Sequence, residues 1–132
     1  MTGKTSLQDL LASMEPVLID GEFAFATVDG IPDTIVPLMS FREKEGITII
    51  ADIGQLEAAG VAYSFRCRQI TLNVHSSLEA VGFLAAITAC LSEAGMGVNP
   101  ISAFYHDHLF IAEQNAAEAL ARLRALSRQS GV

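Results

Sequence analysis

The stretch ITLNVHSSLEAVGFLAAITACLSEAGMGVNPISAFYHDHLFI, residues 70–111, decides the fold. Apolar and polar side chains alternate over residues 70–75, which predicts a strand. Residues 76–95 open with a Ser-Ser-Leu-Glu capping box, are mostly apolar and stop at a glycine, which predicts the longest helix of the chain. Residues 101–105 and 109–111 predict the two strands of a hairpin that turns at His106 and Asp107.

An amphipathic helix is predicted next, over residues 115–128. Leu120 and Leu123 share its apolar stripe, and Glu118 and Arg122 can pair at i,i+4 on the other side. Strand, helix, strand, strand and helix make a ferredoxin-like βαββαβ unit that lacks its last strand. We expect the first half of the chain to supply that strand.

The first half offers two candidates for the missing strand, residues 17–20 and residues 23–28. Further capping boxes predict short helices, and period-2 or buried apolar runs predict more strands. The helices are expected over residues 5–14 and 52–59, and the strands over residues 36–41 and 47–51, with a charged turn at residues 42–46. The predicted fold class is therefore α+β. Two tandem ferredoxin-like units, in residues 1–64 and 65–132, are expected to interleave and share strands. Each unit is expected to be an antiparallel sheet with helices packed on one face.

The predicted helix over residues 76–95 is apolar on nearly all sides. Such a helix must be covered on two sides. One cover is the sheet, and the other is a second helix or a second subunit. We therefore expect self-association as a homodimer, or a monomer if the tandem arrangement covers the helix internally.

Composition excludes several classes of protein. The 132 residues are 51% hydrophobic and 17% charged, which argues against intrinsic disorder. The formal charge is −7, and residues 1–60, with 10 acidic and 3 basic side chains, hold all of it. Without a basic patch, neither nucleic acid nor an anionic membrane is an expected partner.

The location of the protein is also an expectation from composition. No apolar run reaches the ~18 residues of a membrane helix. The first 16 residues lack the apolar core of a signal peptide, so a cytoplasmic protein is expected. Cys67 and Cys90 form no CxxC pair, and both are expected to be reduced thiols.

Residues 70–111 resemble an ACT domain, a ferredoxin-like module that is commonly regulatory and commonly binds amino acids. The chain as a whole resembles a family of small bacterial tandem-ACT proteins of unknown function, and more distantly the CASTOR-type arginine sensors. The residues that carry this resemblance are Gly21–Val28 (GEFAFATV), Phe41–Thr48 (FREKEGIT), Thr71–Gly82 (TLNVHSSLEAVG) and Tyr105–His108 (YHDH).

The loop at the start of the predicted long helix is the candidate ligand site. Amides and hydroxyls at a helix N-terminus suit a carboxylate, although Ser76 can equally serve only as the cap. The resemblance implies that an amino acid binds between this loop and the strand after the helix. The candidate ligand-binding residues are His75, Ser76, Ser77, Leu78, Asn99, Ile101 and Ser102.

Other chemistry finds less support in the sequence. His106, Asp107 and His108 are metal-ligand types, with His75 as a further ligand, but they have no metal-site spacing, and we expect neither a metal nor a cofactor. Asp107 is instead expected to hold the turn through an Asx-type bond. No GxSxG, GxGxxG or phosphate-loop motif is present, so no catalytic residue is assigned. The prediction is a non-catalytic regulatory protein that binds a small molecule, with a module that docks a partner as the alternative.

Overall fold

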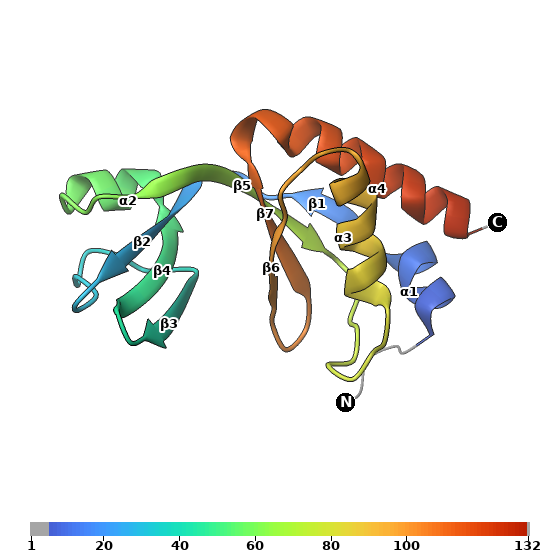
Figure 1. Cartoon of the computed structure of the whole chain (residues 1–132), viewed down its shortest axis with the longest axis horizontal. Coiled ribbons are helices and arrows are strands. Elements are labelled where there is room, and N and C mark those ends of the chain that lie inside the picture. The colour runs from blue at the N-terminus through green and yellow to red at the C-terminus, as the bar shows by residue number, and fades with distance from the viewer. Residues whose placement is uncertain (1–5, 132) are drawn as a thin grey trace.

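The structure, a computed structural model, describes residues 6–131 (Figure 1). The helices of this part of the chain are α1 (Leu7–Ser13), α2 (Ile53–Ala58), α3 (Phe83–Glu93) and α4 (Ala116–Ser130), with a 3₁₀ turn η1 (Glu113–Asn115). The strands are β1 (Pro16–Leu18), β2 (Phe23–Val28), β3 (Met39–Glu43), β4 (Gly46–Asp52), β5 (Ser64–Leu72), β6 (Asn99–Ser102) and β7 (Asp107–Ala112). The predicted order of strand, helix, strand, strand and helix in the second half is confirmed.

Strand β5 is shared by two four-stranded sheets, which together form one continuous seven-stranded sheet. The strand order is β3-β4-β2-β5-β7-β6, and β1 also pairs with β5. All pairings are antiparallel. Both β3-β4-β2-β5 and β1-β5-β7-β6 are four-stranded sheets in the ferredoxin-like order, so the predicted fold class is confirmed.

The partner of β5 changes along one of its edges. Ser64 and Cys67 face β2, whereas residues 70–72 face β1. A bulge interrupts the pairing with β2, and Phe65 has a φ of 65°, which is unusual for a residue with a large side chain. The bulge bends β5, and Figure 1 shows the strand arching from one half of the molecule to the other.

The missing strand of the second unit comes from residues 16–18, the first of the two predicted candidates. Leu18 packs on the core of the second unit. Leu10 and Met14 of α1 are buried in the same core, together with Ile87 of α3 and Leu123 of α4. Helix α1 and strand β1 thus lie against the second half, while the division into residues 1–64 and 65–132 stays a prediction.

Three apolar clusters occupy the two faces of the sheets. One lies between the second sheet and α1, α3 and α4, and another between the first sheet, α2 and Ile35. The third lies on the opposite face and joins the two halves through Phe23, Ile50, Cys67 and Phe110. Burial in that cluster raises the pKa of the Cys67 thiol to about 11. Helices therefore cover one face of each sheet, as predicted.

Helix α3 does not begin at the predicted capping box. It starts at Phe83, seven residues after Ser76, and at 11 residues it is shorter than the 15-residue α4. The Ser76 hydroxyl donates to Asp107, and the Ser77 hydroxyl accepts from the Glu79 amide at 3.1 Å. Neither hydroxyl caps the helix, and the prediction of a helix over residues 76–95 was wrong at its start.

The other three helices begin within two residues of their predicted starts, although not all of them have the predicted cap. Asp52 accepts from the Gln55 amide at 3.2 Å and caps α2, and Ser6 accepts from the Asp9 amide at 3.5 Å and caps α1. Thr5, the predicted cap of that first helix, lies outside the described residues. Helix α4 begins after Asn115 without a side-chain cap.

The second cover of α3 is a helix of the same chain. Phe83, Ile87 and Leu91 face the core under the sheet. Helix α4 lies alongside, where the Cys90 thiol approaches the Arg122 carbonyl at 3.9 Å. Of the two predicted covers, a second helix or a second subunit, the structure shows the first. None of the helices within residues 6–131 has the length and apolar character needed to cross a membrane.

The helix-free face of the second sheet carries a polar cluster of Gln69, Thr71 and His108. His108 Nδ1 lies 2.9 Å from the Thr71 hydroxyl and 3.3 Å from the Gln69 amide nitrogen. Burial lowers the pKa of His108 below 6.5, and the charge of His106 lowers it further, while Asp107 opposes both. The folded protein therefore favours the neutral imidazole.

Leu10→Ala should lower the free energy of unfolding by about 2–5 kcal/mol, because Leu10 is fully buried against the second unit's helices. Leu7→Ala in the same helix is the matched control, since Leu7 is 40% exposed, and it should lower that energy by less than about 1 kcal/mol. Urea denaturation followed by circular dichroism measures both. Equal effects would show that α1 does not contribute to this core.

His108→Gln should reduce the loss of stability on acidification. In the wild type the unfolded state takes up the His108 proton at a higher pH than the folded state does, so stability falls as the pH drops through about 6.5. The variant lacks this pH-dependent contribution to the free energy of unfolding. Unfolding free energies measured at about pH 7.5 and about pH 5.5 test the prediction, and an equal fall in both proteins would contradict it.

Candidate functional site

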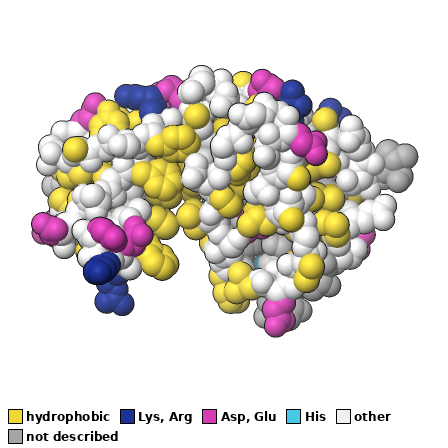
Figure 2. Space-filling model, in the orientation of Figure 1, with side chains coloured by type: hydrophobic (Ala, Val, Ile, Leu, Met, Phe, Trp, Pro, Cys, Tyr) yellow, Lys and Arg dark blue, Asp and Glu magenta, His cyan; other side chains and the backbone are white. Residues whose placement is uncertain are grey.

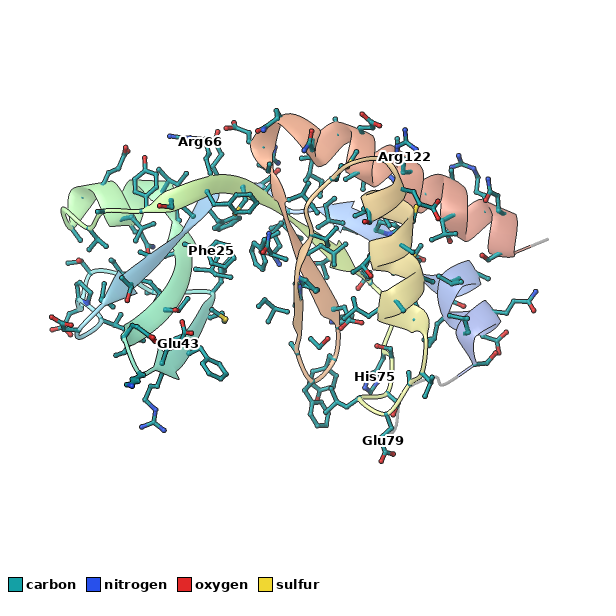
Figure 3. All side chains as sticks on the ribbon, viewed as in Figure 1. Phe25, Glu43, Arg66, His75, Glu79 and Arg122 are labelled. Atoms are coloured by element: carbon teal, nitrogen blue, oxygen red, sulfur yellow. The ribbon has the colours of Figure 1, made fainter. Side chains whose placement is uncertain are left out.

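A cavity of about 200 Å³ lies where the loop between β5 and α3 meets the hairpin of β6 and β7. Figure 3 shows this end of the molecule, with His75 and Glu79 on the loop. The lining residues come from the loop, from the first turn of α3 and from the hairpin. They are Ser76, Ser77, Leu78, Ala80, Phe83, Leu84, Ser102, Ala103 and Asp107.

Asp107 supplies the charge of this cavity. It is 7% exposed, and among residues 6–131 it is the one charged side chain in the buried class. It occupies the first position of β7, opposite Ser102 on β6 and Leu72 on β5. The Ser76 hydroxyl donates to its carboxylate at 3.4 Å. The Asp107 carboxylate therefore does not form the expected Asx-type turn. The hairpin is closed instead by a backbone hydrogen bond, which the Ala103 amide donates to the His106 carbonyl at 3.0 Å.

Apolar side chains supply much of the remaining lining. Phe83 is 2% exposed and forms part of the core, and Leu84 follows it on α3. Leu78, at 66% exposure, stands at the mouth of the cavity. Gly82 precedes α3 with a φ of 90°, a conformation that glycine adopts without strain and that turns the loop into the helix. The cavity thus combines one carboxylate, three serine hydroxyls and an apolar base.

The structure brings four of the seven predicted ligand-binding residues to this cavity: Ser76, Ser77, Leu78 and Ser102. The ring of His75 lies beside Tyr105, with 5.3 Å between centroids, and is not among the lining residues. Asn99 and Ile101 are on the other face of β6, because successive side chains of a strand alternate. Ile101 packs against the cluster around Phe110 there.

Sequence reasoning missed Asp107 as a residue of the site. The sequence instead suggested a turn-stabilising role for Asp107, and grouped it with His106 and His108 only as residues of metal-ligand type. His108 projects from the opposite face of the sheet toward Thr71, and its ring centroid lies 6.3 Å from that of His106. Within residues 6–131, no group of three His, Cys, Asp or Glu side chains is placed to hold a metal ion.

Matches to known protein families fall on the two halves of this fold. Two family models, each described as an ACT domain, match residues 2–68 and residues 64–125. The two matches overlap at residues 64–68, in the first part of β5, the strand that both sheets share. A search of curated proteins found no match.

Solved structures share the whole architecture. A protein of unknown function from Vibrio cholerae, described as a possible transport protein, is 39% identical, with a TM-score of 0.83 over 93% of this chain and 97% of that chain. A protein from Agobacterium tumefaciens is 15% identical, with a TM-score of 0.72 over 86% of this chain and 89% of that chain.

The ligand-free regulatory subunit of aspartate kinase from Thermus thermophilus has a TM-score of 0.64 at 12% identity, over 88% of this chain and 97% of that chain. At 15% and 12% identity, the Agobacterium and Thermus structures show the fold alone. The first family match covers just over half of the sequence, and the second covers most of the remainder. The protein belongs to the ACT domain family and carries two ACT domains in tandem.

Proposed function

We propose that the protein is a non-catalytic regulatory protein that binds a small amino acid in the cavity between the β5–α3 loop and the β6–β7 hairpin. The observation that carries the proposal is the buried Asp107 carboxylate on the wall of this cavity. A buried charge is costly unless a counter-charge or hydrogen bonds satisfy it. The Ser76 hydroxyl provides one hydrogen bond, and the ammonium group of an amino acid supplies the missing positive charge.

The other walls suit the rest of an amino acid. Its carboxylate accepts hydrogen bonds from the hydroxyls of Ser77 and Ser102, and its side chain contacts Phe83 and Leu84. The volume of about 200 Å³ is below the range of roughly 300–1,000 Å³ that holds drug-sized ligands. A small side chain is therefore favoured over an aromatic one.

Membership of the ACT domain family supports a regulatory, ligand-binding type of role. The likeness to the aspartate kinase subunit agrees with it, since that protein is described as a regulatory subunit. The arrangement of side chains gives no support to nucleophilic catalysis at this cavity. Its hydroxyl–carboxylate pair, Ser76 and Asp107, is not joined to a histidine, because the His75 ring lies beside Tyr105.

Docking of a partner is the second candidate function, and an exposed apolar patch favours it. Four side chains near the cavity are each more than half exposed: Leu78, Val81, Phe104 and Tyr105. Such a patch is typical of surfaces that meet another molecule.

A homodimer in the cytoplasm is the form we propose for the working protein. Size-exclusion chromatography with light scattering tests it, and a single 14 kDa species would contradict a stable dimer.

Asp107→Asn should weaken amino-acid binding by about tenfold or more, because a charged partner for the ammonium group is replaced by a neutral amide of the same shape. Isothermal titration with glycine, alanine, serine and threonine measures the effect. Glu79→Gln is the matched control, since Glu79 lies on the same loop but is exposed and does not line the cavity.

Two outcomes would contradict the proposal. One is a folded wild-type protein that responds to none of the common amino acids at millimolar concentration. The other is an Asp107→Asn protein, folded by circular dichroism, that binds as tightly as the wild type. Glu79→Gln should keep the wild-type response, since a loss in that variant as well would mean that the effect is not specific to the Asp107 carboxylate.

A further inference from the structure

Arg68 on β5 is a half-buried cation without a carboxylate partner. One of its terminal nitrogens, Nη2, donates to the Ile19 carbonyl at 3.2 Å. Its Nε is buried and has no hydrogen-bond partner among the described residues. By contrast, Arg66, two residues earlier on the strand, pairs with Glu22 and approaches Glu113 at 3.8 Å.

This lack of an acidic partner is unexpected in such an acidic chain. The protein holds 15 acidic and 8 basic side chains, yet no Asp or Glu within residues 6–131 lies within salt-bridge distance of Arg68. Taking a guanidinium out of water without a counter-charge is unfavourable. Exposed arginines such as Arg42 are solvated, so this desolvation cost does not apply to them.

Arg68 lines a cavity of about 430 Å³ that is separate from the first one. This second cavity lies where the β1–β2 turn and the beginning of α2 meet the middle of β5, near the labelled Arg66 in Figure 3. Figure 2 shows basic side chains close to acidic ones along this upper edge of the molecule. The lining residues are Gly21, Glu22, Asp52, Ile53, Gly54, Arg66 and Arg68, and none of them lines the first cavity.

The charges around the second cavity limit what can bind there. The Glu22 carboxylate is paired with Arg66, and Asp52 accepts from the Gln55 amide. Arg68 has no carboxylate within salt-bridge distance among residues 6–131, while the two carboxylates in the same lining repel a multiply charged anion such as phosphate more strongly than a singly charged one. A guanidinium presents donors that match a carboxylate.

We propose that the second cavity binds a small monocarboxylate, whose carboxylate group is held by the guanidinium of Arg68. The ligand supplies an ion-pair partner at salt-bridge distance, which no carboxylate within residues 6–131 provides. This site is independent of the amino-acid site proposed at Asp107, since the two cavities share no lining residue and only the second is lined by residues of β5.

Acetate tests the proposal, because it has a carboxylate and no ammonium group for Asp107 to bind. The full chain is labelled with ¹⁵N and titrated with sodium acetate against sodium chloride of equal ionic strength. We expect saturable shifts of the Arg68 Nε–H signal and of the Gly54 amide. Arg68→Gln should raise the Kd for acetate by about tenfold or more, and the exposed Arg42→Gln should leave it unchanged.

Three results would overturn the proposal: shifts that chloride reproduces, an Arg68→Gln protein that binds acetate as tightly as the wild type, or inorganic phosphate that binds more tightly than acetate. If Arg68→Gln does not fold, Arg68→Lys keeps the charge but not the planar donors, and it should still weaken binding. Asp107→Asn should leave the acetate shifts intact, so failure at one cavity is distinguishable from failure at the other.

Discussion

The backbone hydrogen bonds of β5 are the constraint on which the rest of the structure depends. One edge of this strand binds β7, and the other binds first β2 and then β1. The change of partner requires the bulge near Phe65, and it bends the strand between two sheets. Because β5 completes both four-stranded sheets, neither unit has its full sheet without the other. The apolar cluster around Phe110 joins the same two halves on the helix-free face.

One candidate cavity is lined by the loop that follows this shared strand, and the other by residues of the strand itself. One is at its carboxyl end, where the chain leaves for α3, and the other is at its middle, beside Arg66 and Arg68. Each contains a charge that the protein only partly satisfies, a carboxylate at Asp107 and a guanidinium at Arg68. Desolvated charges of this kind are more often a property of binding sites than of cores. The strand that organises the fold thus also positions the groups with which a ligand can interact.

Local sequence patterns predicted elements well where the deciding contacts are local. Residues 23–28, in which Phe and Thr side chains alternate with Ala and Val, form β2 with those bounds, and Asp52 caps α2 through the Gln55 amide three residues on. The capping box predicted at Ser76 does not form, because the Ser76 hydroxyl donates instead to a distant group, the Asp107 carboxylate 31 residues away. The first half of β5 was also missed, since exposed Ser64 and Arg66 hide its strand character.

The sequence by itself determined the ferredoxin-like order of elements in the second half and the need for a strand from the first half, because periodicity is encoded locally, and its resemblance to ACT domains pointed to the loop at Ser76 and Ser77. Only the tertiary structure decided which candidate strand completes the second sheet and which side chains share a cavity. Alternation along β6 turns Ile101 away from Ser102, and the register of β7 buries Asp107 beside the loop. Those outcomes depend on hydrogen-bond registers between distant segments, which no local pattern specifies.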